Sequence, residues 1–424
     1  MNIQQAVFKK LFTKLLPLIM FMYFLSFVDR ANIGIASLTM NQDLGISTAA
    51  YGLGAGLFFI GYFIFGLPSN IMLAKLGARK WISCILLVWG LISTSTMFVR
   101  SAEQLYVVRF LLGVAEAGFY PGIIFYLGNW FPADAKARAF TYFHMSLAIS
   151  MCVGNVLSGL ILQMDGLANM AGWQWVFLCE GFPAVICSFV AYRVLLDSPK
   201  DASWLNEEEK TWLINQLETE KGAKVLGNVS TMEVLKKLPV WHLSIIYLTL
   251  NTGFYGIIFW LPQIVKEMTG ANNTITSLLS AIPWLVALVV MFFVAGYADR
   301  AKKKKLFVAV PIFIGGLGLI LGTYLKSYPV LALSALSIST AACECCVGPF
   351  WTFPSRMFNG VTGAVAIAIV NAIGNLSGFV GPYVFGIVTK GGNFRMGLIF
   401  LAAMMVVSGI LAMFLKEVDE GKSA

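Results

Sequence analysis

The sequence is poor in charged residues. Asp, Glu, Lys and Arg make up 12% of its 424 residues, compared with about 25% in an ordinary soluble domain. Hydrophobic residues make up 58%, and the mean hydropathy is +0.78. So few charges cannot give a domain of this size a solvated surface, which excludes a soluble globular protein. We therefore expect a polytopic membrane protein that lies in a lipid bilayer.

Histidines and metal-binding patterns are also scarce. The chain has two histidines, and its seven cysteines lie mostly inside apolar runs. Cys343, Cys345 and Cys346 are close in sequence but point to different faces of a helix, so we interpret them as packing residues. No acid–base pair lies outside the apolar runs, and no cofactor motif is present. These absences argue against an enzyme, and we predict no cofactor and no metal.

Twelve apolar runs are each long enough to cross a bilayer, which takes about 20 residues of helix. A polar stretch, Asp197–Lys237, separates six runs from the other six, and within it Asn206–Lys210 is typical of a capped helix start. The sequence predicts an all-α membrane protein with twelve transmembrane helices in two six-helix halves, residues 1–195 and 240–424, joined by a cytoplasmic central loop, residues 196–239. The predicted spans are Leu15–Met40, Tyr51–Ala74, Trp81–Val99, Gln104–Gly128, Ala139–Gln163, Trp173–Leu195, Val240–Pro262, Ile275–Ala298, Leu306–Leu325, Tyr328–Phe350, Gly363–Thr389 and Phe394–Leu415.

Positive charge is concentrated on one side of this arrangement. With a cytoplasmic N-terminus, 23 Lys and Arg residues lie in cytoplasmic segments, five lie on the other side and two lie within spans. Because basic residues mark the cytoplasmic side of short loops, we expect both termini in the cytoplasm. The same pattern explains the net charge of +9, so we expect no nucleic acid partner. The basic N-terminal segment resembles a signal peptide, but we interpret the first run as an uncleaved span.

Two pairs of charged residues in the first and fourth runs are the main candidates for a functional site. Asp29 and Arg30 are near the middle of the first run, where each charge costs about 2.5–3.5 kcal/mol on insertion scales. Charges held at such a cost usually mark a pathway for a substrate or an ion. The fourth run holds Arg109 and Glu116, which are seven residues apart and so share one helix face. We infer a transport site; the alternative is that these charges only pair to hold helices together.

The two halves echo each other, because similar basic loops, Ala74–Lys80 and Asp299–Lys305, follow the second and eighth runs. More specific patterns lie at Asp29–Gly34, Pro68–Leu73, Arg109–Gly122, Gly172–Gly181 and Asn371–Asn375. Over nearly its whole length the sequence resembles the major facilitator superfamily, and within it the anion:cation symporter family of tartrate, phthalate, hydroxyphenylacetate and sugar-acid permeases. One position departs from the family pattern, since Ala74 stands where the family often has Asp.

The resemblance implies roles for the charged residues. Asp29 and Glu116 would take up protons, and Arg30 would hold the carboxylate of the substrate. Arg30 suits this role on its own chemistry, because a guanidinium binds a carboxylate through two parallel hydrogen bonds. Arg109 fits proton coupling and a purely structural role equally well.

Other polar residues within the spans are candidates for contact with the substrate. Tyr62 matches a family position that faces the cavity. Asn371 and Asn375 lie four residues apart on one face of the eleventh span, and Asn251 and Tyr255 repeat this spacing in the seventh. These groups would bind hydroxyls or a second carboxylate of the substrate. The alternative is hydrogen bonding between helices, worth about 0.6 kcal/mol on average.

Four further residues receive a structural interpretation or stay open. We interpret Glu180, near the start of the sixth span, as half of a structural pair. For His144 we expect core packing or a single hydrogen bond, and for His242 a place at the membrane interface. Glu344 lies among the cysteines of the tenth span. The sequence leaves open whether its side chain packs between helices or faces the cavity.

The combined observations favour a secondary active transporter that takes up a small organic anion, such as tartrate, a sugar acid or hydroxyphenylacetate, with protons by alternating access. The alternatives are an uncoupled facilitator or an anion exchanger of the same fold and, less favoured, a membrane receptor that does not transport. The expected partners are the small organic anion, protons and lipid, and we expect a monomer. The family resemblance implies the inner (plasma) membrane of a bacterium.

Overall fold

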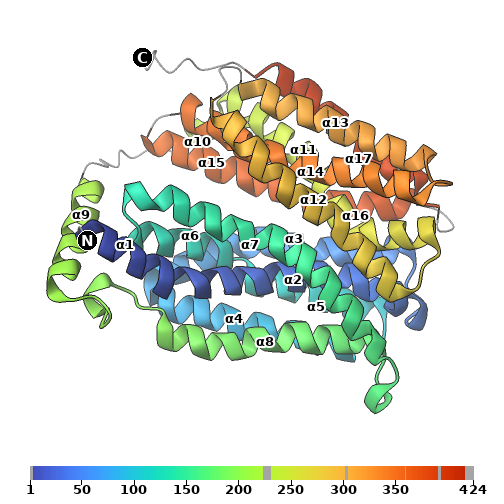
Figure 1. Ribbon diagram of the computed structural model, residues 1–424, viewed down its shortest axis with the longest axis horizontal. Coiled ribbons are helices and arrows are strands. Elements are labelled where there is room, and N and C mark those ends of the chain that lie inside the picture. The colour runs from blue at the N-terminus through green and yellow to red at the C-terminus, as the bar shows by residue number, and fades with distance from the viewer. Residues whose placement is uncertain (1–2, 223–230, 301–303, 359, 390–392, 416–424) are drawn as a thin grey trace.

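The computed structural model describes residues 3–222, 231–300, 304–358, 360–389 and 393–415, which are almost entirely α-helical (Figure 1). Twelve helical segments are long and apolar enough to cross a membrane, so the predicted fold class and number of spans are confirmed. The first six spans are α2 (Leu16–Asp43), α3 (Thr48–Leu76), α4 (Ala78–Ser95), α5 with α6 (Ala102–Glu116, Phe119–Trp130), α7 (Ala133–Ile161) and α8 (Gly172–Val194). The last six are α11 (Leu238–Thr269), α12 (Asn273–Arg300), α13 (Lys304–Tyr324), α14 (Pro329–Met357), α15 with α16 (Gly360–Asn375, Ser377–Val388) and α17 (Arg395–Met413).

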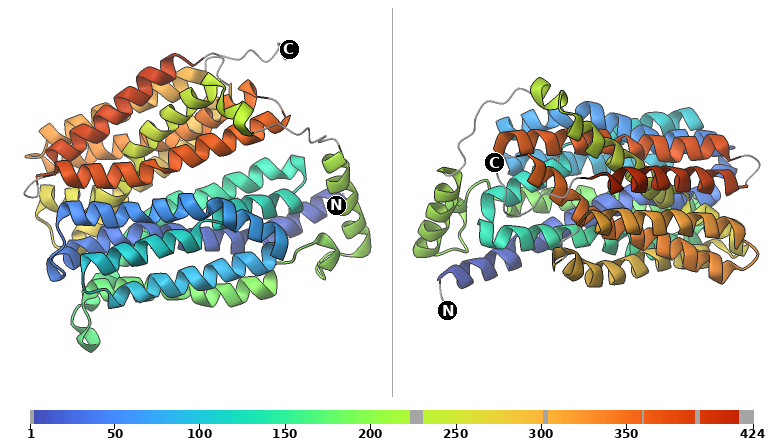
Figure 2. Two further views of the ribbon diagram at one scale, coloured as in Figure 1. Left: turned by 180° about the vertical axis from the view of Figure 1, so that it is seen from behind. Right: turned by 90° about the horizontal axis from the view of Figure 1, so that it is seen from above.

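The spans form two groups of helices that lie side by side (Figure 1 and Figure 2). The first group runs from α2 to α8, and within it α4 packs on α8 and α3 on α5. The second group runs from α11 to α17, and within it α13 packs on α14 and α17. The groups touch where α3 meets α16, α7 meets α12 and α2 meets α11. Part of the predicted charge pattern, at Lys224, Lys302, Lys303, Lys390, Lys416 and Lys422, lies outside the described residues, so the orientation of the termini stays a prediction.

Two of the predicted spans are broken near their middle. The fourth span is divided between α5, which ends at Glu116, and α6, which begins at Phe119. Pro121 favours this break, because a proline cannot donate to the carbonyl four residues earlier and its ring crowds that carbonyl. The eleventh span is likewise divided after Asn375. The breaks place Glu116 and Asn375 at helix ends within the bundle, where transporters commonly build their binding sites.

The seventh helix differs from its prediction in length. We expected this span to end at Pro262, but α11 continues to Thr269 with the proline inside it. The helix ends there because Gly270 adopts a left-handed conformation, with φ at 61°, and donates its N–H to the carbonyl of Lys266. Gly270, which can cap the helix, therefore marks the end of α11 better than the end of the apolar run at Pro262 does.

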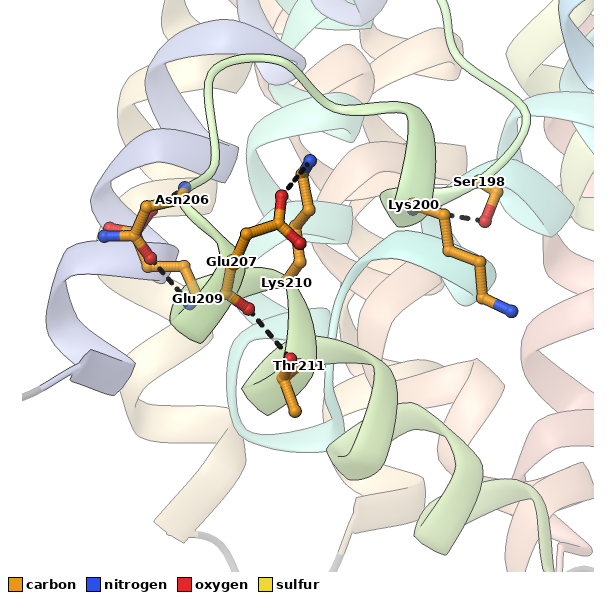
Figure 3. A network of polar contacts seen from close by, with 7 residues as sticks. All are labelled: Ser198, Lys200, Asn206, Glu207, Glu209, Lys210 and Thr211. Carbon is orange, nitrogen blue, oxygen red and sulfur yellow. Dashed lines mark hydrogen bonds and ion pairs between the residues drawn. The ribbon is translucent and has the colours of Figure 1, made fainter.

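The polar stretch between the groups contains α9 (Glu207–Gly222), which packs against α1 (Ile3–Lys14) at one end of the molecule (Figure 1). Figure 3 shows its first turn, where Asn206 Oδ1 accepts from the Glu209 N–H at 2.8 Å and Glu209 Oε2 accepts from the Asn206 N–H at 2.9 Å. This reciprocal cap confirms the predicted helix start. Lys10 Nζ of α1 lies 2.6 Å from the same Glu209 oxygen. Burial acts to raise the pKa of Glu209, but the bonds from Lys10 and Asn206 outweigh it and leave the pKa lowered.

Polar contacts join the two groups at the end opposite α1 and α9. The Tyr51 hydroxyl donates to the Phe259 carbonyl at 2.8 Å, and the Gln263 amide donates to the Ser37 hydroxyl at 2.8 Å. Gln163 also donates to the Thr274 hydroxyl at 3.1 Å. Because these bonds hold the two groups together here, we call this the closed end of the molecule.

Candidate functional site

Arg30 and Glu116 form a buried ion pair. Nη2 of Arg30, in the middle of α2, contacts Oε1 of Glu116, the last residue of α5. Ser26 lies one turn before Arg30 on the same helix face, and its hydroxyl also donates to Glu116 Oε1. Glu116 is 1% exposed and Arg30 is 7% exposed. The structure thus brings together two residues that were predicted from separate stretches of the chain.

Close packing between α3 and α5 positions this pair. A Cβ atom at Gly113 would lie 1.9 Å from the Phe58 carbonyl oxygen, and one at Gly61 would lie 2.3 Å from the Phe110 carbonyl oxygen. Glycine at both positions lets the two backbones approach, as small residues do between membrane helices. The approach carries the end of α5, with Glu116, to the face of α2 that bears Arg30.

Aromatic rings surround the Arg30 guanidinium. Its central carbon lies 4.8 Å from the ring centroid of Phe27, 4.9 Å from that of Phe58 and 5.6 Å from that of Tyr62. Tyr255, from the second group of helices, is within hydrogen-bonding reach of the same guanidinium. The Nε of Arg30 has no hydrogen-bond partner among the described residues. This cation therefore keeps a free donor beside two tyrosines, although it is paired with Glu116.

Asp29 faces away from Arg30 and binds to different neighbours. Its carboxylate accepts hydrogen bonds from the Trp89 indole N–H at 2.6 Å, from the Ser93 hydroxyl, and from the Asn32 amide at 3.2 Å. Consecutive residues of a helix project about 100° apart, so adjacent charges reach different helices. Sequence reasoning missed Trp89 and Ser93, whose spacing of four residues on one face of α4 was the available signal.

Arg109 is buried without an ion-pair partner among the described residues. It is 1% exposed, and neither its Nε nor its Nη2 has a hydrogen-bond partner in that part of the chain. Its guanidinium carbon lies 5.3 Å from the ring centroid of Phe58. Asp29 and Glu116 are close enough to interact with it electrostatically. Arg109 therefore completes a cluster of two cations and two carboxylates.

The predicted substrate-contact residues are only partly brought together. Tyr62 and Tyr255 lie at Arg30, but no hydrogen bond links the half-buried Asn371 or Asn375 to any described residue. Between these two amides, Gly374 makes room for a ring of α11, since a Cβ there would lie 2.0 Å from Tyr247 Cδ1. The two amides therefore have no partner among the described residues, and no hydrogen bond links them to the Arg30 cluster in that part of the chain.

Several aromatic residues near the cluster were not predicted. The Tyr23 ring stacks on Phe143 with centroids 4.1 Å apart, and the Tyr120 hydroxyl lies 3.0 Å from His144 Nε2. His144 thus makes the expected single hydrogen bond, but its side chain is exposed rather than packed in a core. Glu344, which the sequence left open, is half-buried, and its Oε1 has no partner among the described residues.

Twelve spans with buried charges at broken helices define a membrane transporter rather than an enzyme. The chain belongs to the Major Facilitator Superfamily, whose family model matches residues 19–366.

Comparison with known proteins gives the same class. A protein of Agrobacterium vitis named "Putative tartrate transporter" is 39% identical over 415 residues, covering 98% of this chain and 92% of that protein. A "Quinolone resistance transporter" of Acinetobacter baumannii is 37% identical over 413 residues, covering 97% and 95% of the two chains. The crystal structure of a D-xylose–proton symporter matches with a TM-score of 0.76 at 15% identity, covering 97% of this chain and 99% of that one, and shows the fold alone.

Proposed function

We propose that this transporter takes up a small organic anion together with protons, and the Arg30–Glu116 ion pair is the observation that carries the proposal. An anionic substrate that binds Arg30 must compete with Glu116, which already contacts the guanidinium. Protonation of Glu116 removes the competing negative charge. Proton binding and anion binding then favour each other, and this reciprocity is the thermodynamic requirement for coupled transport.

The surroundings of Arg30 suit a carboxylate group. Arginine binds a carboxylate through two parallel hydrogen bonds, and the free Nε supplies one of the donors. The hydroxyls of Tyr62 and Tyr255, two residues near Arg30, would bind a neighbouring hydroxyl of the substrate. Asn371 and Asn375, whose side chains form no hydrogen bond with a described residue, would hold its far end. A hydroxylated acid such as tartrate or a sugar acid has these features, and relatives of this chain are named for tartrate.

Asp29 is proposed as the second proton carrier. Three donors now stabilise its charged form, and it faces Arg109 across the cluster. With Asp29 and Glu116 both charged, the two arginines are balanced. When both carboxylates take up protons, the cluster gains two positive charges, which favours the entry of an anion. Arg109 is proposed to hold this electrostatic balance rather than to touch the substrate.

The two groups of helices are proposed to be the moving halves, residues 1–195 and 240–424, linked by residues 196–239. We propose that both termini lie in the cytoplasm of a bacterial cell, so that the closed end faces outward and the state described here is the inward-facing one. Protons and substrate would bind when the closed end opens, and they would leave toward the cytoplasm in the state described. The membrane potential supplies about 2.3 kcal/mol per charge per 100 mV for each inward movement of positive charge.

Uptake into proteoliposomes tests the proposal. Labelled tartrate, galactonate, hydroxyphenylacetate and phthalate are offered with and without an inward proton gradient. We expect one acid to accumulate and the accumulation to collapse with a protonophore. Glu116→Gln is expected to keep counterflow but lose accumulation, while Glu103→Gln, an exposed carboxylate on the same helix, behaves as wild type.

Other outcomes identify the competing functions. Equilibration that ignores the proton gradient would show an uncoupled facilitator. Movement only against an internal anion would show an exchanger. Binding without movement would show a receptor. Accumulation that persists in Glu116→Gln would remove the proton-carrying role from that residue.

A further inference from the structure

Glu180 is a buried carboxylate that the proposed cycle does not use. It lies in α8 with 5% of its surface exposed. Its Oε1 accepts a hydrogen bond of 2.6 Å from the Ser158 hydroxyl of α7, and its Oε2 has no partner among the described residues. No Lys, Arg or His in that part of the chain interacts with it. The structural pair expected for Glu180 is thus a hydroxyl, which leaves a negative charge uncompensated.

Asn32 connects Glu180 to Asp29. The Asn32 Nδ2 donates to Asp29 Oδ1 at 3.2 Å, and the Asn32 side chain is near enough to Glu180 to interact with it. An amide nitrogen carries two hydrogens, so one Asn32 side chain can serve both carboxylates. The other end of this amide, Oδ1, is buried and has no donor among the described residues. A buried acceptor without a donor in the described part of the chain therefore belongs to the same side chain that binds Asp29.

Close helix packing brings this set together. Gly181 follows Glu180, and a Cβ atom there would lie 2.8 Å from the Ser93 hydroxyl oxygen of α4. The same Ser93 hydroxyl donates to Asp29. Among the described residues of the helices that pack on α8, Asp29 is the titratable group that interacts with Glu180, and Cys179 is its neighbour along the chain. The charge of Glu180 therefore depends on Asp29 and on no cation.

The donors are divided unequally between the two carboxylates. Asp29 accepts from three donors, whereas Glu180 accepts from one and has an unpartnered oxygen. Two like charges that share one amide disfavour each other, and a charged group without donors is costly to bury. A proton on Glu180 Oε2 removes this charge and turns an acceptor that has no partner among the described residues into a donor. The geometry thus favours a charged Asp29 and a neutral Glu180.

We propose that Glu180 is a third proton-carrying carboxylate, which exchanges its proton with Asp29 beside Asn32 during transport; this inference rests on the proposed proton coupling. In the step, the O–H bond on Glu180 breaks and an O–H bond forms on Asp29, while the Asn32 amide keeps both of its N–H hydrogens. The negative charge moves from Asp29 to Glu180, and the pair carries one negative charge before and after this step. Asp29 can then release the proton on the substrate side, while Glu180 stores it in the state described here.

Infrared spectroscopy of the purified full-length protein tests the resting state. The spectrum of the wild type minus that of Glu180→Gln is expected to contain a carbonyl band of a protonated carboxylic acid at neutral pH. Asp29→Asn should move the pH at which this band disappears, because it removes the negative charge that shares Asn32. Absence of the band at neutral pH would overturn the proposal. Ser158→Ala, which removes the hydrogen bond and keeps the carboxyl group, should retain the band.

A transport assay distinguishes a proton that leaves Glu180 in each cycle from a proton that stays on it. Glutamine mimics a protonated glutamate that cannot release its proton, so Glu180→Gln should keep tartrate counterflow. Loss of one coupled proton should lower the accumulation ratio about tenfold across a pH gradient of about one unit. Glu180→Asp should restore part of this ratio. A Glu180→Gln protein with the wild-type ratio and pH profile would show that the proton never moves, and the proposal would fail.

The two proposals fail in different ways. If wild-type uptake ignores the proton gradient but the infrared band titrates in response to Asp29→Asn, then proton-coupled uptake is wrong and the shared proton of Glu180 and Asp29 is supported. If the gradient drives wild-type uptake and the band is absent, coupling stands and the role of Glu180 is wrong. Where Glu180→Gln does not fold, Glu180→Asp and Asp29→Asn supply the same infrared comparison.

Discussion

The Tyr51 hydroxyl of α3 donates a hydrogen bond of 2.8 Å to the Phe259 carbonyl of α11, across the boundary between the two groups of helices. Both residues are fully buried, and the Tyr51 ring meets Trp260 edge to face at 4.9 Å. The bond belongs to the set that holds the closed end together. If the groups are halves that rock against each other, this bond must break once in every cycle.

Tyr51→Phe is expected to favour the open form of this end. The ring packing is retained, and one hydrogen bond worth about 1 kcal/mol is lost. The ratio of open to closed molecules should rise about fivefold. Spin labels at Glu103 and Ser327, exposed residues from the two groups, measure the separation of the groups in a cysteine-free background. Tyr106→Phe is the control, since its hydroxyl forms no hydrogen bond with a described residue. Equal distance distributions for Tyr51→Phe and wild type would show that the bond does not hold the end closed.

The close contact at Gly52 should affect closure of this end more strongly than the Tyr51 hydrogen bond does. A Cβ atom at Gly52 of α3 would lie 2.4 Å from the Pro382 carbonyl oxygen of α16, and neither backbone can yield without moving its helix. Gly52→Ala should therefore separate the two helices and lower the closed population about tenfold or more, as overpacking usually does. Tartrate counterflow should fall with it. Gly66→Ala in the same helix meets nothing within 4 Å and serves as the control. If both variants exchange substrate at the wild-type rate, the contact is not needed for closure.

Hydropathy was enough to predict twelve spans, and the charges within the predicted spans identified residues from distant stretches that lie together in the structure. The number of spans follows from the length of the apolar runs. Charges buried within spans usually pair with one another, because few other groups there can stabilise a charge. The partners of Asp29 could not be predicted, because the tilt and rotation of α4 decide whether Trp89 and Ser93 reach it. The break after Glu116 had a signal in Pro121, but a proline alone does not distinguish a kink from two helices. The count of basic residues predicts on which side of the membrane each loop lies. It gives no information about an uncharged residue within a span, such as Asn32.

The contact between α1 and α9 should depend on Glu209. This residue caps α9 and binds Lys10, and these bonds lower its pKa although burial opposes them. A lowered pKa in the folded state means that the stabilisation is present above the ordinary value of 4.5 and is lost as the pH falls through the folded value. Glu209→Gln should therefore reproduce at neutral pH what acid does to the wild type. Loss of the negative charge weakens the contact with Lys10 and the hydrogen bond from the Asn206 N–H, at a cost of about 1 kcal/mol, so amides in the first turns of α9 should exchange about fivefold faster. Glu208→Gln, an exposed neighbour in the same turn, should leave exchange unchanged, and equal rates in both variants would contradict the role of the Glu209 charge.

Arg30 should require a guanidinium and not only a positive charge. Arg30→Lys keeps the charge beside Glu116 but removes the planar donor pair and the contacts with the rings of Phe27 and Phe58. The KM for tartrate should rise about tenfold or more, which corresponds to the loss of one strong charge-assisted hydrogen bond. Arg79→Lys, on the surface and away from the cluster, should leave KM unchanged. The double variant Arg30→Lys with Glu116→Gln tests the competition directly. Because the neutral amide introduced by Glu116→Gln no longer holds the cation, the KM of the double variant should be lower than that of Arg30→Lys alone. A KM that Glu116→Gln does not improve would show that the substrate does not displace Glu116 from Arg30, and the coupling by competition would be wrong.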